Sequence, residues 1–334
     1  MIRVGVIRGG VSPEYEVSLL TGANVISHLK SEKLKEKYKP IDIFIDRNGV
    51  WHKNGLPVSF EKISEGVDVI WNALHGDYGE DGKVQQVLDH WKIPYTGSEA
   101  FPSALAYHKG LAKDQFNFHN IKTPKHILLP VYQEDIDGPF RDYAHKKAEE
   151  IFRKIPPPWI VKPFSGGSSV GIHVCKDNLS LLYALKDVAL TGASVMVEEL
   201  ITGKEATVGV IEGFRGQKLY ALPTIEIRIP KHKSHFDYGA KYNGESEEIC
   251  PGNFKREEKD ILEKVAKEIH EKLGLRHYSR SDFIVNPKKG IYALEVNTLP
   301  GLTDASLLPK GLEAVGATMP EFIDHILKKA LNRG

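Results

Sequence analysis

The sequence has little cysteine and no long apolar run, and each shortage excludes a class of protein. Cys175 and Cys250 are the only cysteines among 334 residues, so neither a disulfide framework nor a zinc site built from Cys-x-x-Cys pairs is expected. No apolar run reaches the roughly 20 residues that a membrane-spanning helix needs. The first residues, 1–7, form a strand-like run without the apolar segment and cleavage site of a signal peptide, which predicts a cytoplasmic protein.

A dominant charge is also missing. Lysine and arginine number 45 against 44 aspartates and glutamates, a net charge of +1. This balance excludes a protein that wraps an extended polyanion, but it allows a small basic pocket for phosphate. Hydrophobic residues at 41% and charged residues at 27% are typical of a soluble globular chain. The length predicts two or three domains. These features favour an enzyme that acts on small molecules, with neither nucleic acid nor a membrane as partner.

Strand and helix patterns alternate in the first part of the chain. Apolar residues at 2–7 predict a buried strand that ends in Gly9-Gly10, and Ser12-Pro13 has the form of the N-cap and first position of a helix. Further strands are predicted at 41–45 and 67–74. Strand–helix–strand alternation indicates an α/β fold with a parallel sheet.

Two more blocks follow the first. The predicted boundaries are an N-terminal α/β domain at 1–97, a central domain at 98–198 and a C-terminal domain at 199–334. The elements predicted in the central block are helices at 100–118, 141–153 and 178–190, with strands at 125–129, 159–162 and 171–174. Those predicted in the C-terminal block are strands at 195–197, 206–212 and 219–227, helices at 256–273 and 319–331, and a hairpin at 278–297. The polar stretch 228–250 has no clear period, and a loop of that length is usually functional or disordered.

The hairpin brings two acids together. Its turn is predicted at Asn286–Gly290, between two runs that are mainly apolar or aromatic. Opposed residues in an antiparallel pair have a constant sum of residue numbers, and we take the register that places Val285 opposite Tyr292. That register places Asp282 opposite Glu295.

An arginine and an amide join the same face. Arg280 faces Asn297 in this register, and both share a face with the two acids because strand side chains alternate with period 2. Opposed carboxylates repel unless a cation lies between them. Two carboxylates and an amide supply hard oxygen ligands that suit Mg²⁺, which leaves its other positions to water and phosphate. We therefore predict a metal site at Asp282, Glu295 and Asn297, with Arg280 facing phosphate or a developing oxyanion. The alternative is a surface hairpin whose charges are solvated.

A loop of glycine and serine follows the strand that carries Lys162. In the segment 163–171, glycines let the backbone approach an anion closely and serine hydroxyls can donate to it, which is typical of a phosphate cover. Gly171 is not followed by the Lys-Ser/Thr pair of a Walker A loop. Residues 167–171 do match the G-x-S-x-G pattern of serine hydrolases, but that elbow needs a helix directly after it and 172–175 is strand-like. A serine hydrolase and a plain connecting turn remain as alternatives.

Two weaker signals are an acidic strand end and a glycine-rich loop. The strand at 195–197 runs into Glu198 and Glu199, with Glu205 beyond. A strand end and a nearby carboxylate suit adenine and ribose, although acids in turns are usually just solvated. His75 stands beside glycines at a strand end, where open α/β sheets bind ligands, although a lone histidine is more often structural.

These motifs belong to a longer ordered set that spans essentially the whole chain. Its segments are 9–19, 75–82, 94–98, 103–105 with Lys109, 161–171, 240–242, 280–282, 295–298, 300–303 and 306–307. In residues and in order, the set resembles the ATP-grasp ligases and, within them, the D-alanine–D-alanine ligases. The resemblance implies three α/β domains with ATP held between the central and C-terminal ones. It also implies a homodimer.

The reaction implied by the resemblance has two steps. ATP phosphorylates the carboxylate of one D-alanine, and the amine of a second D-alanine displaces phosphate to give D-alanyl-D-alanine for peptidoglycan. ATP and two Mg²⁺ or Mn²⁺ ions are the implied cofactors, with the metals on Asp282, Glu295 and Asn297. The stretch 228–250 would act as a lid, because an acyl phosphate must be kept from water.

The resemblance also implies a role for individual residues. Around ATP these are Lys109, Lys162 and Lys241 at the phosphates, Glu198, Glu199, Leu200 and Ile201 at adenine, and Glu205 at the ribose. Around the substrates they are Glu14 at the first ammonium, His75 in the same site, and Ser306 with Leu307 at the second carboxylate. Arg280 and the backbone N–H of Gly301 would stabilise the tetrahedral intermediate, while Ser168 and Tyr242 would link Glu14 to the lid.

Other functions remain open at this point. Tyr242 favours the dipeptide, because relatives that make D-alanyl-D-lactate carry a different residue there. The alternatives are a related ligase that uses D-lactate or D-serine as the second substrate, another ATP-grasp carboxylate–amine ligase, a nucleotide-binding protein without catalysis, and the serine hydrolase.

Overall fold

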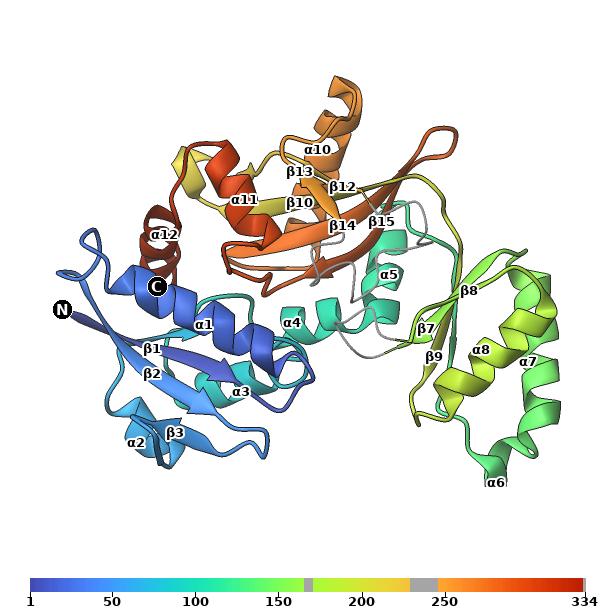
Figure 1. The fold of residues 1–334 in the computed structure, drawn as a ribbon, viewed down its shortest axis with the longest axis horizontal. Helices are drawn as coiled ribbons and strands as arrows, with labels where there is room; N and C mark the ends of the chain where they lie inside the picture. Colours follow the sequence, from blue (N-terminus) through green and yellow to red (C-terminus); the bar gives the residue numbers. More distant parts are fainter. Residues whose placement is uncertain (165–170, 229–245, 333–334) are drawn as a thin grey trace.

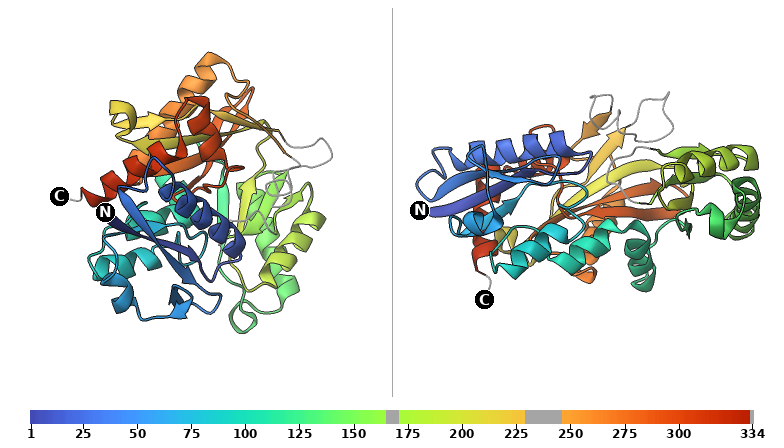
Figure 2. Two further views of the ribbon diagram at one scale, coloured as in Figure 1. Left: turned by 60° about the vertical axis from the view of Figure 1, so that its left-hand side comes forward. Right: turned by 90° about the horizontal axis from the view of Figure 1, so that it is seen from below.

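Three β-sheets with covering helices make up the described part of the molecule, an α/β architecture as predicted. The structure is a computed structural model that describes residues 1–164, 171–228 and 246–332. Figures 1 and 2 show the blocks built on these sheets along the long axis, with the third sheet between the first and the second. The order of the sheets in space therefore differs from their order in the chain.

The first sheet has five strands in the order β4-β3-β2-β1-β5. Its strands are β1 (Ile2–Gly9), β2 (Tyr38–Ile45), β3 (Trp51–Lys53), β4 (Leu56–Pro57) and β5 (Val69–Asn72). The predicted parallel pairing is confirmed for β1 with β2 and β5, whereas β3 and β4 add an antiparallel edge. The middle of β1, residues 4–7, is buried on both faces, and these residues are uncharged.

The helix after β1 begins later than predicted. It is α1 (Tyr15–Leu29), with Glu14 rather than Ser12 at the N-cap position. Ser12 instead forms a preceding turn, in which its hydroxyl accepts a hydrogen bond from the Glu14 N–H at 2.9 Å. The remaining helices of this block are α2 (Phe60–Ser64) and α3 (Lys83–His90).

The second sheet is antiparallel, in the order β6-β9-β7-β8. Its strands are β6 (His126–Leu129), β7 (Trp159–Pro163), β8 (His173–Cys175) and β9 (Val195–Glu199). Helix α8 (Asn178–Ala189) packs on this sheet and α7 (Phe140–Lys154) packs on α8, with the short α6 (Glu134–Asp137) before them. Trp159 and Leu181 are fully buried in the core that results. All the elements predicted for this stretch form, with shifted ends.

The helix predicted at 100–118 is two helices. They are α4 (Ala100–Tyr107) and α5 (Lys109–Phe118), separated at His108, whose ψ of 91° is extended. The His108 ring caps α5 by accepting a hydrogen bond from the Leu111 N–H at 3.0 Å. Neither glycine nor proline stands at position 108, and apolar residues occur on both sides of it. The sequence pattern therefore predicts one continuous helix. Both helices pack against the third sheet, and Phe116 lies in its core.

Outside the gap at 229–245, the third sheet holds six strands. They are β10 (Lys204–Glu212), β11 (Leu219–Ala221), β12 (Ile225–Arg228), β13 (Glu247–Ile249), β14 (Tyr278–Asn286) and β15 (Gly290–Asn297). The single strand predicted at 219–227 is therefore two strands, which both pair with β10. Its helices are α10 (Arg256–Lys272), α11 (Leu307–Ala314) and the short η1 (Phe214–Gly216).

The last helix returns to the first sheet. Helix α12 (Met319–Leu331) packs against α1 and β5. Its Phe322 meets the Trp71 ring edge-on at 6.2 Å between centroids, and it contacts Tyr278 in the same way at 5.4 Å. One core thus joins residues from both ends of the chain. Within the described residues, none of the helices is long and apolar enough to cross a membrane.

Candidate functional site

The hairpin β14–β15 opposes the two predicted pairs. Asp282 lies opposite Glu295, and Arg280 lies opposite Asn297. The pair from which this register was taken is wrong, because Val285 lies opposite Ile291 and not Tyr292. A bulge after Asp282 places one extra residue in β15. The register between the turn and the bulge therefore differs by one residue from the prediction, whereas the register at Asp282 and Arg280 agrees with it.

Arg280 and a threonine hold Asp282. The Arg280 guanidinium donates from Nε to Oδ1 at 2.9 Å and from Nη2 to Oδ2 at 2.8 Å, so the pair is bidentate. Thr207 of β10 donates its hydroxyl to Oδ1 at 2.6 Å. Thr207 was not predicted from the sequence, although it lies on a strand that pairs with β14. Arg280 is buried, so its charge is held in the protein interior and close to the acid.

Lys109 holds the second acid. Its ammonium lies 2.6 Å from Glu295 Oε2. Burial would lower the pKa of Lys109, but Glu295 outweighs that effect and raises it. Asn297 Oδ1 accepts a hydrogen bond from the Leu299 N–H at 2.8 Å, which orients its amide at the end of β15. Two carboxylates, an amide and two flanking cations thus meet on one face of the hairpin.

The donor set of this face fits Mg²⁺. Within the described residues, no group of three or more His, Cys, Asp or Glu side chains is placed to hold a metal ion. Asp282 and Glu295 with the amide of Asn297 are instead the small, hard set that Mg²⁺ takes when phosphate and water complete its shell.

Lys162 meets Glu198 across the second sheet. Its ammonium lies 2.6 Å from Glu198 Oε2, while Lys113 of α5 lies 2.9 Å from Oε1. Burial would raise the pKa of Glu198, but the two lysines outweigh it and bring the pKa to about 2. Lys113 was missed in the sequence, where its one signal is its place four residues after Lys109 on the same helix face.

The rest of the predicted adenine segment follows β9. Glu199 forms an ion pair with Lys289 of the hairpin turn at 3.0 Å. The Leu200 N–H donates to the Pro158 carbonyl at 3.0 Å, and Ile201 is buried. Glu205 lies on β10, paired in register with β12 and β14. The segment therefore connects the second sheet to the third.

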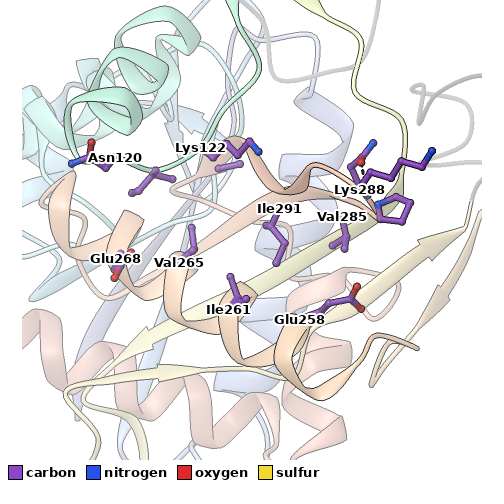
Figure 3. A pocket seen from close by; sticks show the side chains of 14 residues that line it. Asn120, Lys122, Glu258, Ile261, Val265, Glu268, Val285, Lys288 and Ile291 are labelled. Atoms are coloured by element: carbon purple, nitrogen blue, oxygen red, sulfur yellow. Dashed lines mark hydrogen bonds between the residues drawn. The ribbon is translucent and has the colours of Figure 1, made fainter.

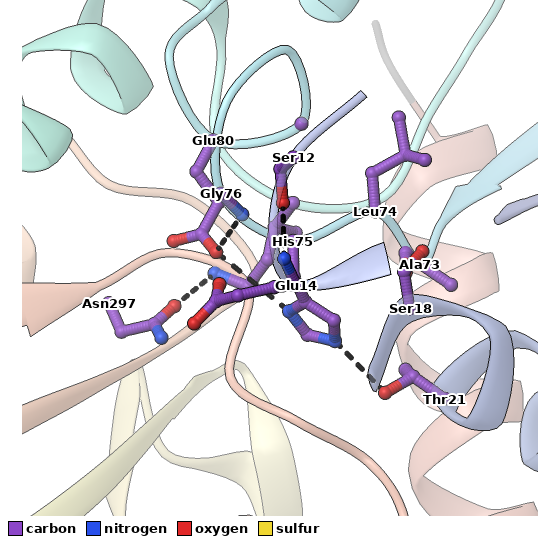
Figure 4. Close-up of polar contacts among 12 residues, drawn as sticks. Ser12, Glu14, Ser18, Thr21, Ala73, Leu74, His75, Gly76, Glu80 and Asn297 are labelled. Carbon is purple, nitrogen blue, oxygen red and sulfur yellow. Dashed lines mark hydrogen bonds and ion pairs between the residues drawn. The ribbon is translucent and has the colours of Figure 1, made fainter. Parts of the chain in front are cut away.

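A buried polar group lies at the start of α1 (Figure 4). Glu14 is 7% exposed and His75 is 5% exposed. His75 Nε2 lies 2.9 Å from the Thr21 hydroxyl of α1, and its Nδ1 lies 3.8 Å from Glu80. Glu80 also accepts the Gly76 N–H at 3.0 Å. His75 is therefore held on both sides, and Glu80 is a contributor that the sequence reasoning did not single out.

Gly76 brings this loop close to Glu14. Its φ is +68°, and a Cβ at this position would lie 2.7 Å from Ser12 Oγ and 3.4 Å from Glu14 Oε2. A side chain there would clash with the turn that precedes α1, so glycine is required.

The loop before α11 packs tightly around a serine. A Cβ on Gly301 would lie 2.8 Å from Ser306 Oγ. Ser306 Oγ also accepts the Thr303 N–H at 3.1 Å. Asn24 of α1 donates to the Leu302 carbonyl at 2.6 Å, so this loop is tied to the helix that follows Glu14.

Arg280 and Leu307 line one small cavity, together with Thr207. The predicted oxyanion group and the predicted site of the second substrate therefore adjoin. Three predicted site residues, Ser168, Lys241 and Tyr242, lie outside the described residues.

A larger groove lies elsewhere. It has a volume of about 470 Å³ and lies between α10 and the hairpin, with Lys122, Ile261 and Ile291 in its lining (Figure 3). None of its lining residues is a predicted site residue.

The serine hydrolase alternative meets a structural objection. Its elbow needs a helix directly after the G-x-S-x-G motif. Residues 173–175 form β8 instead, which pairs with β7. The described residues after the motif therefore continue the sheet where the elbow needs a helix.

Comparisons with known proteins find similar sequences over the whole chain. A family model described as "D-ala D-ala ligase C-terminus" matches residues 131–328, and one described as "D-ala D-ala ligase N-terminus" matches 3–66 and 53–98. A D-alanine--D-alanine ligase of Fervidobacterium nodosum is 36% identical over 332 residues, with 99% of each chain covered.

Solved structures give the same result. The D-alanine--D-alanine ligase of Bacillus anthracis complexed with ATP is 30% identical, with a TM-score of 0.77 over 99% of this chain and 98% of that one. The VanG D-Ala:D-Ser ligase of Enterococcus faecalis is 27% identical, with a TM-score of 0.83 over 98% and 99%.

Proposed function

This chain belongs to the D-alanine–D-alanine ligase family, and from that premise we propose that it joins two D-alanines into D-alanyl-D-alanine with ATP. It is an ATP-dependent carboxylate–amine ligase with a role in peptidoglycan precursor synthesis. The observation that supports the proposal is that Lys109 pairs with Glu295 and Arg280 pairs with Asp282, from different elements, on opposed strands of one hairpin. Lys162 adds a third cation, paired with Glu198 of the second sheet. Cationic side chains beside two carboxylates that can hold Mg²⁺ form a site that can bind the triphosphate of ATP.

The chemistry proceeds in two displacements. A carboxylate oxygen of the first D-alanine attacks the γ-phosphorus of ATP, the bond to the β,γ-bridging oxygen breaks, and ADP leaves. The amine of the second D-alanine then attacks the acyl phosphate carbon, loses a proton and expels inorganic phosphate. Arg280 and the Gly301 N–H stabilise the oxyanion of the tetrahedral intermediate. When Mg²⁺ is bound by Asp282, Glu295 and Asn297, it neutralises phosphate charge.

Other residues bind and enclose the reactants. Glu14, near His75, takes the ammonium of the first D-alanine, and Ser306 with the N–H of Leu307 takes the carboxylate of the second. The nucleotide is bound by Lys109, Lys162 and Lys241 at the phosphates, by the 198–201 segment at adenine and by Glu205 at the ribose. Ser168 and Tyr242, with the stretch 228–250, exclude water from the acyl phosphate.

We further propose the setting of this activity. The domain boundaries lie near residues 97 and 198, the protein is a homodimer, and it acts in the cytoplasm. D-serine is the competing second substrate, because the similarity to the VanG D-Ala:D-Ser ligase is high in fold.

Phosphate release tests the function directly. The protein is incubated with ATP and Mg²⁺ and with D-alanine, L-alanine, D-alanine plus D-serine, or no amino acid, and products are identified by mass. Phosphate release that depends on D-alanine, with D-alanyl-D-alanine as main product, is expected. A mixed dipeptide as main product would favour the D-serine alternative, and ATP turnover without a response to D-alanine would overturn both.

A further inference from the structure

Lys113 is a buried cation that the mechanism above does not use. Its side chain is 1% exposed, and it lies on the face of α5 that meets the sheets. Its ammonium lies 2.9 Å from Glu198 Oε1 and donates to the Thr123 hydroxyl at 2.9 Å. Burial lowers the pKa of Lys113, which Glu198 offsets only in part. A lysine held at such a cost is rarely present for packing alone.

Glu198 divides its charge between two lysines. Lys113 approaches Oε1 from the core, whereas Lys162 approaches Oε2 at 2.6 Å and is 15% exposed. A carboxylate that faced Lys162 alone would neutralise it. With Lys113 on the other oxygen, the three groups together keep one unit of positive charge, and the exposed end of that charge is Lys162.

The same helix face reaches the third sheet. Lys109 and Lys113 are one turn apart on α5, and Lys109 is paired with Glu295 of β15. Thr123, which accepts from Lys113, donates to the Ala293 carbonyl of β15 at 2.8 Å. Through these contacts α5 links Glu198 of β9, the partner of Lys162, to β15, the strand that carries Glu295.

We propose that Lys113 is a positioning residue for the nucleotide: it shares the charge of Glu198, so that Lys162 is held in place and still attracts an ATP phosphate. The inference rests on the proposed function only in taking ATP as the anion. Lys113 itself does not touch the nucleotide. Its loss should weaken nucleotide binding and leave the binding of D-alanine unchanged.

The test compares charge with structure. Lys113→Met removes the charge at nearly equal length, and Lys113→Gln removes the charge but keeps a group that can donate to Glu198 and Thr123. Calorimetric titration with ADP and Mg²⁺ measures affinity, alongside KM for ATP and for D-alanine. We expect both variants to lose about tenfold in nucleotide affinity, with KM for D-alanine within about twofold.

Two controls separate the causes. Thr123→Val keeps the Lys113 charge but removes one of its hydrogen-bond partners, so it should lower the melting temperature with little change in nucleotide affinity. Lys218→Met breaks an exposed ion pair with Glu271 outside the site and should change neither. Nucleotide affinity that is unchanged in Lys113→Gln, or lowered equally in Thr123→Val, overturns the inference.

The two proposals fail in different ways. If the wild type binds ADP but makes no dipeptide, the proposed function fails, and the effect of Lys113→Gln on ADP affinity still decides the inference. If the wild type makes dipeptide and Lys113→Gln binds ADP normally, only the inference fails. A wild type that binds no adenine nucleotide overturns both.

Discussion

Asp282 and Glu295 face each other across β14 and β15, and each is held by a different basic side chain. Arg280 belongs to the same strand as Asp282, so its position follows from strand alternation. Lys109 belongs to α5, far from Glu295 in the chain, and its partner was not evident from the sequence. The acids are thus preorganised by one local and one long-range contact.

The first prediction concerns these acids. Asp282→Asn or Glu295→Gln should reduce turnover by at least about 100-fold. Each variant removes one carboxylate ligand of the metal ion that neutralises phosphate charge, and it also removes the charged partner of Arg280 or Lys109. Phosphate release with Mg²⁺ as the only metal measures the effect, and circular dichroism checks the fold. The control is Lys204→Gln, at the start of β10, which pairs with the strand of Asp282. This variant should retain activity. Full activity in either acid variant would contradict the site assignment.

A second prediction concerns the hydroxyl beside Asp282. Thr207→Val keeps the shape of the side chain but removes its 2.6 Å hydrogen bond to Oδ1. Because such a contact orients a ligand and tunes its basicity, affinity for Mn²⁺ should fall about 10-fold or more. Electron paramagnetic resonance of free Mn²⁺ measures this in the presence of ADP. Thr207→Ser is the control and should bind Mn²⁺ nearly as the wild type does. Equal affinity in all three proteins would remove Thr207 from the metal site.

Among the elements, α5 has the most consequence for the site. It begins at Lys109 and presents two lysines, and its start depends on His108, whose ring accepts the Leu111 N–H. The same ring contacts Phe164 edge-on at 4.0 Å between centroids, at the end of β7. A single residue therefore ends α4, caps α5 and contacts Phe164, which directly follows the strand that carries Lys162.

His108→Ala tests that cap. The loss of the acceptor should cost about 1 kcal/mol of stability and should raise KM for ATP through the displaced Lys109. Thermal unfolding and ATP kinetics provide the measurements. His108→Asn retains a good N-cap and should recover most of the stability. If both variants lose the same amount, the contact with Phe164, and not the cap, is the important interaction.

In the whole molecule, α12 joins the two ends of the chain. Phe322 is fully buried against Trp71 of the first sheet and Tyr278 of the third. Phe322→Ala should cost about 3–5 kcal/mol, because it leaves a cavity in the core that both blocks share. Urea unfolding followed by fluorescence gives the value. Phe118→Ala, at a largely exposed phenylalanine, should change stability little. A small loss in Phe322→Ala would mean that α12 contributes little to the core.

Glu212, where the blocks meet, is expected to make the stability of the fold depend on pH. Burial would raise the pKa of Glu212, but the His270 ring, whose Nε2 lies 3.8 Å from Oε1, and a 2.7 Å hydrogen bond from the His277 N–H bring it from 4.5 to about 2. His277 in turn accepts the Gly97 N–H at 3.1 Å, so the acid stands between blocks. Because the folded pKa is depressed, this stabilisation is complete above about pH 4.5 and is lost as pH falls toward 2.

Acid titration of stability tests this sign. The wild type should lose on the order of 2 kcal/mol through this group as pH falls from about 4.5 to 2, whereas Glu212→Gln should lack that part of the dependence. Urea unfolding at a series of pH values provides the comparison. A Glu212→Gln variant with the same acid dependence as the wild type would assign the loss to other carboxylates, of which Glu198 is the first candidate.

Features that arise between near neighbours in the chain were predictable. The opposition of Asp282 and Glu295, the α/β class and the strand after Gly171 depend on alternation, turns and short-range sterics. Those forces act within a few residues, so the order of residue types reports them. The bulge in β15 shows the limit even here, because the register near the turn was misjudged while the functional pairs were right.

Features that join distant segments were not predictable. The break at His108, the partner of Lys113 and the packing of α12 on the first sheet each depend on which surfaces meet after folding. Burial of a charge without a partner costs a large free energy, so the fold must supply an opposite charge. The sequence does not say which strand carries that partner. Glu198 is a strand-end acid in the sequence, and it becomes the shared partner of two lysines only when α5 packs between the second and third sheets.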